Sequence, residues 1–547
     1  MGKFSKKQNL EQGAVILLLS TVIVKLIGAF FKIPLSSKFC LGDLGFGYFS
    51  AAYDLFTPVY MMAISGFPVA ISRMIADYNA KEMKGTAKKA FKVSIKTLSL
   101  IGIAGCVLLL LAVIPFVNLT DKSGESIYCV LAVIPAFFFC CIVSCYRGYY
   151  EGVFNMVPAA VSNVIEALGK LLLGFTFAFV TVRLTGKPAS GAAAALIGIT
   201  LGTVLSACYL NVKYKKDNKN LDFKNEFSDV NDKDIARLLI VTAIPIVLSS
   251  LSGSLVTLID TFTVRWQLCV AVDADFEGLK SIYSAVIDEY NISAVSPLTA
   301  EQFPTLLYGI RSKAYTIYNI VPTFTTALGV GAVPILAKAL AKGDKTLIKN
   351  SSETVLKFTS LIVFPATAGL LALSDNVMSL LYCKGASAEL GGQMLFIFAA
   401  ACLFAGLSIP LCSMLQALSL QKSAFLNVLI GMAVKIIGNL VLCSVTKLNI
   451  FGSVISTLLC YIVIFVLNFI VLLKQTGNYL QMISVFIKPF FAAILCAFSA
   501  FVVSLLGDSS IITVLSIAVG VIVYIVALVL LKAISKQEIA NFLKKQA

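Results

Sequence analysis

Apolar runs of about 20 residues recur along almost the whole chain, and each run is long enough to cross a bilayer as a helix. Of the 547 residues, 59% are hydrophobic and only 13% are charged, which excludes a soluble globular protein. The runs predict an all-α polytopic membrane protein with about 14 transmembrane helices. The helices are expected at residues 13–33, 46–71, 93–116, 127–147, 158–182, 190–211, 238–262, 311–337, 355–373, 393–413, 423–444, 450–473, 484–506 and 511–533.

The positions of lysine and arginine predict the orientation, because basic residues collect in the cytoplasmic loops. With both termini in the cytoplasm, the basic segments 81–92, 213–219, 338–349 and 544–545 all fall inside. Residues 263–310 would then form a long, mostly acidic external loop. The net charge of +16 follows from this topology, so it does not indicate nucleic-acid binding.

The first apolar run is predicted to be a retained helix. A signal peptide would lack lysines within its apolar stretch and would be followed by small residues at a cleavage site. Here the run contains Lys25 and Lys32, and no such site follows it.

Several kinds of chemistry find no support in the residues. The chain has no histidine, the commonest general base and metal ligand. Its 14 cysteines lie mostly within predicted helices and form no CxxC pair, so they are interpreted as small apolar residues. No phosphate-binding loop of the GxxxxGK[ST] type is present, which argues against ATP hydrolysis. The sequence therefore favours a transporter over an enzyme.

The chain repeats itself at a spacing of about 261–266 residues. Three pairs of segments match: 53–73 with 318–338, 155–174 with 421–440, and 191–202 with 452–463. An even number of helices in each repeat predicts two six-helix lobes of the same topology. The predicted parts are a first lobe at 1–212, a charged cytoplasmic linker at 213–237, a second lobe at 238–474, and two additional helices with a cytoplasmic tail at 475–547.

Matched prolines and glycines suggest hinges in the two repeats. Gly66 and Pro68 in the first repeat correspond to Gly331 and Pro334 in the second. Proline and glycine interrupt helices, and broken helices at matching places are typical of secondary transporters. The alternative is that they are merely tolerated kinks in a packed bundle.

Four segments carry a resemblance to a known family: KLIGAFFKIPL (25–35), AAYDLFTPVYMMAISGFPVAISRMIAD (51–77), YRGYYEGVFNMVPAAVSNVIEALGK (146–170) and NIVPTFTTALGVGAVPILAKALAKGD (319–344). Together they resemble the polysaccharide-biosynthesis branch of the multidrug/oligosaccharidyl-lipid/polysaccharide (MOP) exporter superfamily, in particular flippases of the MurJ and stage V sporulation protein B type. The resemblance implies a MATE-like fold with a central cavity, in the bacterial cytoplasmic membrane.

The same resemblance implies the activity. The substrate would be lipid II, an undecaprenyl-pyrophosphate-linked disaccharide-pentapeptide, which is moved from the inner to the outer leaflet for peptidoglycan synthesis. The protein would work as a monomer among membrane lipids, without nucleic acid. Alternatives are a flippase for another undecaprenyl-linked oligosaccharide, a multidrug/cation antiporter of the superfamily, and an integral-membrane glycosyltransferase.

Two lysines in the first helix are the main candidates for binding the pyrophosphate. A lysine at the centre of a membrane helix costs about 2.5–3.5 kcal/mol on insertion scales. Lys25 and Lys32 stand seven residues apart, so both can face one cavity. The resemblance places Lys25 at a cationic position before Gly28, and Lys32 at the basic residue before IPL. Lys32 could instead extend to the membrane surface.

Further cations and acids lie within predicted helices. Lys170 and Lys435 occupy similar places in the two repeats, and Arg147 is either a substrate contact or a determinant of topology. Glu166 precedes Lys170 by four residues, the favourable order for a helical ion pair.

The remaining acids predict an ion site. Asp54 and Asp260 are too costly to leave ionised and unpaired in the membrane, so pairing, protonation or ion coordination is expected. The resemblance places Asp260 at an acid linked to sodium coordination. With Asn427 or Asn439 it could bind Na⁺, and the coupling ion would be Na⁺ or H⁺.

Overall fold

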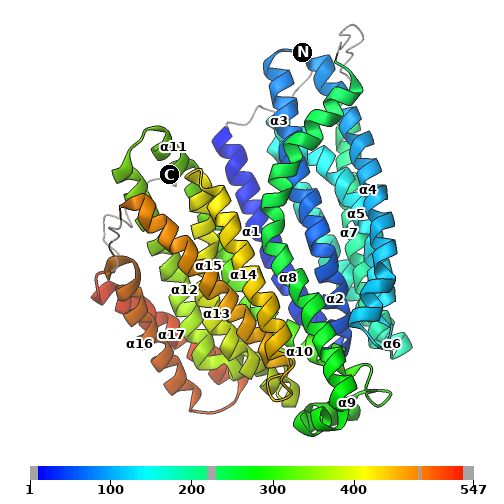
Figure 1. The fold of residues 1–547 in the computed structure, drawn as a ribbon, viewed down its shortest axis with the longest axis vertical. Helices are drawn as coiled ribbons and strands as arrows, with labels where there is room; N and C mark the ends of the chain where they lie inside the picture. The colour runs from blue at the N-terminus through cyan, green and yellow to red at the C-terminus, as the bar shows by residue number, and fades with distance from the viewer. Residues whose placement is uncertain (1–9, 219–229, 478–480, 482, 534–547) are drawn as a thin grey trace. The chain divides into compact units, whose positions relative to one another are not determined.

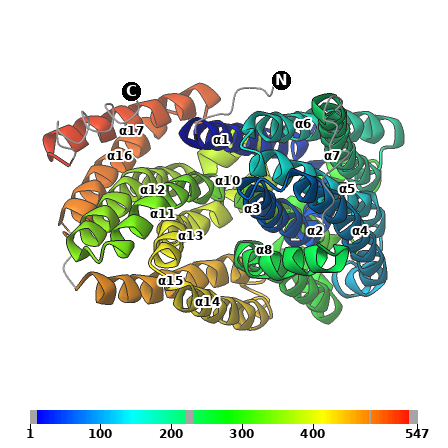
Figure 2. The same ribbon diagram turned by 90° about the horizontal axis from the view of Figure 1, so that it is seen from above.

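The computed structural model describes residues 10–218, 230–477, 481 and 483–533, and all regular elements in these residues are helical. The elements are α1 (Leu10–Leu35), α2 (Gly42–Met61), the π-helical turn η1 (Met62–Gly66), α3 (Phe67–Ala80), α4 (Lys84–Thr120), α5 (Ser126–Gly152), α6 (Met156–Thr185), α7 (Pro188–Asn218), α8 (Asp232–Ile282), α9 (Ser284–Ser293), α10 (Phe303–Tyr318), α11 (Ile320–Ala341), α12 (Lys345–Tyr382), α13 (Ala386–Ala417), α14 (Gln421–Leu442), α15 (Ile450–Thr476), η2 (Ile483–Ile487), α16 (Lys488–Ser504) and α17 (Ser510–Leu530). Figures 1 and 2 show these elements.

The helices confirm the prediction of a polytopic all-α membrane protein. Within the described residues, 13 helical segments are long and apolar enough to cross a membrane. The 26-residue α1 adds a further apolar helix, which matches the predicted total of about 14. Large apolar side chains such as Ile511, Ile522 and Leu530 on α17 are more than half exposed, as expected for a surface that faces lipid tails.

Contacts divide the chain into two compact units, each described here by itself. Unit 1 contains the described residues of 1–276 and 295–309, and unit 2 contains those of 277–294 and 310–547. This division differs from the predicted lobes, because α8 belongs to unit 1 as far as Phe276. The helix is irregular at Asp275, directly before that boundary. The six-helix lobes 1–212 and 238–474 therefore stay a prediction.

Unit 1 is held together by close packing of α5, α6 and α7, with α1 against α6 and α2 against α5 and α7. Glycines permit the closest of these approaches. A Cβ atom at Gly202 of α7 would lie 2.8 Å from the backbone nitrogen of Lys170 on α6. Small residues at such crossings are the usual means by which membrane helices gain van der Waals contact.

In unit 2, α13 packs against α11, α12 and α15, while α16 and α17 pair with each other and cover α12 (Figures 1 and 2). Tyr524 of α17 donates a hydrogen bond to the backbone oxygen of Leu361 on α12 at 3.0 Å. The two helices predicted after the second repeat are therefore present. Residues 534–547 of the predicted tail lie outside the described residues.

The predicted external loop at 263–310 is wrong for most of its length. The helix α8 continues to Ile282 and α9 follows it. The buried residues Val264, Leu268, Val272 and Leu279 recur at helical spacing, so one face of this acidic segment is apolar. Only 294–302 and the turn at Tyr283 lack helical structure. The predicted linker is also partly helical, since α7 reaches Asn218 and residues 219–229 are not described.

The predicted hinge residues lie in different surroundings. Gly66 closes the π-helical turn between α2 and α3, and Pro68 lies in the first turn of α3. In the second repeat the helix continues through Gly331 and Pro334, and the interruption comes earlier, at Asn319 between α10 and α11. A hinge role for these residues remains a prediction.

Candidate functional site: a buried cationic cluster in unit 1

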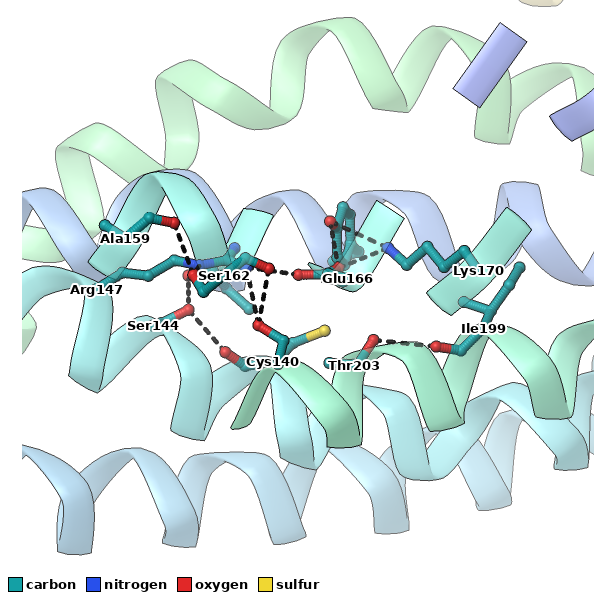
Figure 3. Close-up of polar contacts among 12 residues, drawn as sticks. Cys140, Ser144, Arg147, Ala159, Ser162, Glu166, Lys170, Ile199 and Thr203 are labelled. Atoms are coloured by element: carbon teal, nitrogen blue, oxygen red, sulfur yellow. Dashed lines mark hydrogen bonds and ion pairs between the residues drawn. The ribbon is translucent and has the colours of Figure 1, made fainter. Parts of the chain in front are cut away.

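Four side chains from three helices meet around Glu166, in the interior of unit 1. Glu166 of α6 accepts a hydrogen bond from Arg147 Nη2 of α5 at 2.7 Å and one from Lys170 Nζ at 2.6 Å. Figure 3 shows the two cations reaching the carboxylate from opposite sides. The hydroxyl of Tyr60 on α2 donates a further bond to Glu166 at 2.8 Å. Two of these three donors thus come from helices far from α6 in sequence, and the third comes from α6 itself.

Local sequence explains how this cluster forms. Glu166 and Lys170 are four residues apart on α6, so their side chains share one face of the helix. Arg147 is fixed by two hydroxyl groups: its Nε donates to Ser162 at 2.9 Å and its Nη2 donates to Ser206 of α7 at 3.3 Å. The planar guanidinium can make these contacts and the ion pair together, which a lysine could not.

The cluster carries one more positive than negative charge. Arg147 and Glu166 are 6% and 4% exposed at their side chains, and Lys170 is 16% exposed. Glu166 offsets one of the two cations, and desolvation makes an uncompensated charge expensive in the membrane. The excess charge makes the site suited to an anionic ligand, with Lys170 as the most accessible member.

A second lysine, Lys32 of α1, lies against the same face of α2. The ammonium of Lys32 on α1 lies 4.8 Å from the ring centre of Tyr53, and the ammonium of Lys170 lies 4.4 Å from that of Tyr60. The two tyrosines are seven residues apart and share a face of α2. Cation–π contacts of this kind attract the ammonium group to the face of the ring. Lys25 is half-buried on α1.

The predicted acids of unit 1 lie at a separate place. Asp54 accepts a hydrogen bond from the Tyr308 hydroxyl at 3.0 Å and a long one from Thr261 at 3.5 Å. Asp260, the neighbour of Thr261 on α8, is fully buried. The structure therefore places Asp54 close to the α8 segment that contains Asp260.

In unit 2, the predicted residues Asn427, Lys435 and Asn439 lie on one buried stripe of α14. Asn427 donates to Asn468 of α15 at 2.9 Å, and Asn468 donates to the sulfur of Cys412 on α13 at 3.0 Å. This network is polar but uncharged, apart from Lys435. Asp260 belongs to unit 1 and the asparagines to unit 2, so the predicted Na⁺ site stays a prediction. Within the described residues, no three histidine, cysteine or acidic side chains are grouped to hold a metal.

The sequence repeat relates the two networks. The corresponding residues are Arg147 and Cys412, Ser162 and Asn427, Glu166 and Gly431, and Lys170 and Lys435. The second repeat thus keeps the lysine but replaces the other two charged residues by neutral ones. The two repeats therefore differ here: the lysine of the first repeat has an acid four residues before it, and the lysine of the second does not.

Sequence reasoning missed Arg265, which is fully buried in unit 1. Its Nε donates to the backbone oxygen of Thr120 at 3.0 Å, and its Nη2 donates to Ser126 at 3.2 Å and to Thr305 at 3.3 Å. Asp121 lies 3.9 Å away and is also buried. The arginine ties α8 to α4, α5 and α10. A sequence signal existed, since Arg265 falls on the apolar stripe of α8.

Comparison with known families shows to which family the chain belongs. The family model of polysaccharide biosynthesis proteins matches residues 10–294, which is more than half of the chain. The chain belongs to the polysaccharide biosynthesis protein family. The second half, residues 320–527, matches the family model of the lipid II flippase MurJ. The resemblance inferred from the sequence is confirmed.

Two relatives from Bacillus subtilis (strain 168) are similar to this family member over most of their length. The lipid II flippase MurJ is 24% identical over 483 residues, which cover 86% of this chain and 83% of the relative. Stage V sporulation protein B is also 24% identical, over 551 residues and 97% of both chains.

Solved structures agree on the MOP fold. The lipid II flippase MurJ in an inward closed conformation has a TM-score of 0.62 at 16% identity, covering 94% of this chain and 98% of the other. An inward-facing MATE-family multidrug resistance transporter of the MOP superfamily has a TM-score of 0.62 at 13% identity, covering 84% and 98%. The chain thus has the MOP fold.

Proposed function

We propose that this protein is a flippase that moves lipid II, the undecaprenyl-pyrophosphate-linked peptidoglycan precursor, from the inner to the outer leaflet of the bacterial plasma membrane. It acts as a monomer, with both termini in the cytoplasm and without enzymatic chemistry. The similarity to the lipid II flippase MurJ supports this substrate.

The observation that carries the proposal is the excess of positive charge around Glu166, with Lys32 on the same face of α2. A pyrophosphate lies between the lipid tail and the sugars, so its carrier needs cations at membrane depth. Lys170 and Lys32 supply ammonium groups for this contact, and Arg147 keeps Glu166 from neutralising Lys170 completely. Lys25 of unit 1 would extend this cationic surface, and Lys435 of unit 2 stays a predicted substrate contact.

The transport cycle would follow alternating access, in which the bound headgroup shifts the protein between inward-open and outward-open states. Interruptions at η1 and Asn319 offer places at which helices can bend. The cycle would be driven by the membrane potential, by proton binding, or by Na⁺ binding at Asp260 with Asn427 or Asn439.

A second candidate is a flippase for another undecaprenyl-linked oligosaccharide, including a role in sporulation. The 97% coverage of stage V sporulation protein B favours this alternative. A multidrug/cation antiporter is disfavoured by the net positive cluster, because an organic cation would need an excess of acids.

Complementation in cells depleted of their own lipid II flippase tests the proposal. The parent chain is expected to restore lipid II in the outer leaflet, and Lys32→Ala and Lys170→Met are expected to reduce its export at equal membrane levels. Lys187→Ala, which alters an exposed lysine beside α7, is the control and should behave as the parent. If the parent chain inserts into the membrane but exports no lipid II, lipid II is excluded as the substrate, and another lipid-linked glycan takes its place.

A further inference from the structure

Unit 2 contains an open pocket of about 280 Å³ that none of the residues discussed above lines. It lies between α12, α13 and α15 and is lined by Ser374, Asp375, Gln393, Phe396, Ile397 and Phe451. All six residues belong to unit 2. In the predicted topology this end of α12 faces the outside of the cell. The volume is close to the lower limit of small-molecule sites and suits a single ring.

The backbone at the pocket is irregular. Leu373 of α12 has φ −125° and ψ 21°, so the helix is interrupted directly before Ser374 and Asp375. Pro365 lies two turns earlier and does not account for this position. Within a membrane, non-helical backbone is tolerated where it is buried in protein or lines a cavity. The break thus lies directly before an acid and a hydroxyl of α12 that line the pocket.

The neighbouring helix leaves room for the acid. Gly392 of α13 faces Asp375 so closely that a Cβ atom there would overlap the carboxylate. Gly391 likewise faces the methyl group of Met378. These two glycines bring α13 against α12 at the level of the pocket. The absence of a side chain at Gly392 therefore leaves space for the Asp375 carboxylate at the pocket wall.

The polar side chains of the pocket are available to a ligand. In the described part of the chain, Asp375 forms no ion pair, and neither Asp375 nor Gln393 forms a side-chain hydrogen bond. Asp375 and Gln393 are both exposed, so a ligand in the pocket can reach their side chains. The Asp375 carboxylate offers acceptors only, whereas the Gln393 amide offers two donors and one acceptor.

We propose that this pocket binds one saccharide ring of the lipid-linked oligosaccharide, a subsite that rests on the proposed flippase function. Sugar hydroxyl groups both donate and accept hydrogen bonds, so they satisfy Asp375 and Gln393 together. Phe396 and Phe451 offer aromatic surface to the apolar face of the ring. An ammonium group would use Asp375 but leave the donors of Gln393 without an acceptor.

Binding of a soluble saccharide to the purified full-length chain in detergent micelles tests the inference. The probe is N,N′-diacetylchitobiose, followed by saturation-transfer NMR, with ethylammonium as the cationic comparison. Asp375→Asn and Gln393→Ala are each expected to weaken disaccharide binding about tenfold, the effect of losing one strong hydrogen bond. Size-exclusion profiles confirm that each variant remains folded.

Glu389→Gln is the matched control. Glu389 is an exposed carboxylate on α13, one turn before Gln393; it does not line the pocket, but its charge acts on Asp375. For a saccharide, this change should leave the affinity within about twofold of the parent, because no hydrogen bond to the ligand is lost. The saccharide assignment would be overturned if the parent bound ethylammonium more strongly than the disaccharide and if Glu389→Gln weakened the binding of ethylammonium.

The two proposals can fail separately. The parent chain could export lipid II but bind no disaccharide, or bind it equally well after Asp375→Asn and Gln393→Ala. Either result would overturn the saccharide-binding role of the pocket and leave the flippase function standing. Disaccharide binding that depends on Asp375 and Gln393, in a chain that does not export lipid II, would support the pocket and remove lipid II as the substrate.

Discussion

The Glu166 carboxylate lies 2.7 Å from the Arg147 guanidinium, and both side chains are almost completely buried. The pair joins α5 to α6, and Lys170 approaches the other carboxylate oxygen at 2.6 Å. Removing the acid would leave two desolvated cations facing each other. Glu166 therefore has a structural role that can be separated from the role of Lys170 in binding an anion.

Glu166→Gln is expected to lower the free energy of unfolding by about 3–5 kcal/mol, because it leaves buried cations without their counter-charge. The measurement is denaturant unfolding of the purified chain in mixed micelles. Glu166→Gln combined with Lys170→Met should recover part of the loss, since one of the uncompensated charges is then absent. A single variant as stable as the parent would contradict the structural role of Glu166.

The sequence was sufficient to predict the arrangement of this cluster only in part. The spacing of Glu166 and Lys170 predicted their ion pair, and the repeat predicted that Lys170 and Lys435 occupy similar positions. The contributions of Tyr60 and Arg147 depend on how α2 and α5 pack against α6, which no local pattern records. The difference between Glu166 and Gly431 can be read from the sequence, but the prediction from the repeat compared only the two lysines.

Hydropathy also explains what was missed. Apolar windows end at the first charged residues, so the predicted ninth helix stopped at residue 373, whereas α12 continues to Tyr382. Asp375 was thus placed outside the membrane helix. The same effect moved Arg265 into a predicted loop, although α8 continues well past it. A hydropathy scan therefore assigns charged residues near the end of a helix to the adjoining loop.

Arg265→Ala is expected to destabilise unit 1 by about 3–5 kcal/mol, because Asp121 would then be buried without its cation. Arg265→Lys should recover little of this loss, since an ammonium cannot reach Thr120, Ser126 and Thr305 together. Arg237→Ala, at an exposed position of the same helix, is the control. Thermal unfolding of the three variants in one detergent makes the comparison, and equal loss for Arg237→Ala would refute the assignment.

The Lys384–Asp508 ion pair, at 2.7 Å, predicts a pH dependence outside the membrane-spanning segments. The hydrogen bond from Lys384, aided by its charge, lowers the pKa of Asp508. A lowered pKa in the folded state means that the pair stabilises the fold above the unfolded pKa of about 3.9 and loses this effect as the pH falls through the folded value. Both side chains are about three-quarters exposed, so the effect is small.

Carboxyl-carbon NMR titration of the protein in micelles can measure this pKa directly. Lys384→Gln is expected to raise the pKa of Asp508 toward the value of an isolated aspartate, and about 1 M salt should do the same by screening. Asp344 offers an internal comparison, because it caps α12 and does not contact Lys384. An unchanged Asp508 pKa in Lys384→Gln would show that the pair does not persist in solution.

Substitutions at two helical glycines can distinguish a role in helix packing from a role as a hinge. A Cβ atom at Gly202 would lie 2.8 Å from the backbone of Lys170 and 3.0 Å from that of Glu166, whereas Gly331 has nothing within 4 Å. Gly202→Ala should therefore push α7 away from α6, lower stability and weaken export by displacing Lys170. Gly331→Ala should raise stability by about 0.5–1 kcal/mol, because alanine favours the helix. If Gly331 is a hinge, export must fall in this more stable protein; if export is retained, α11 works as a rigid helix and the bending occurs elsewhere, with Asn319 as the next residue to test.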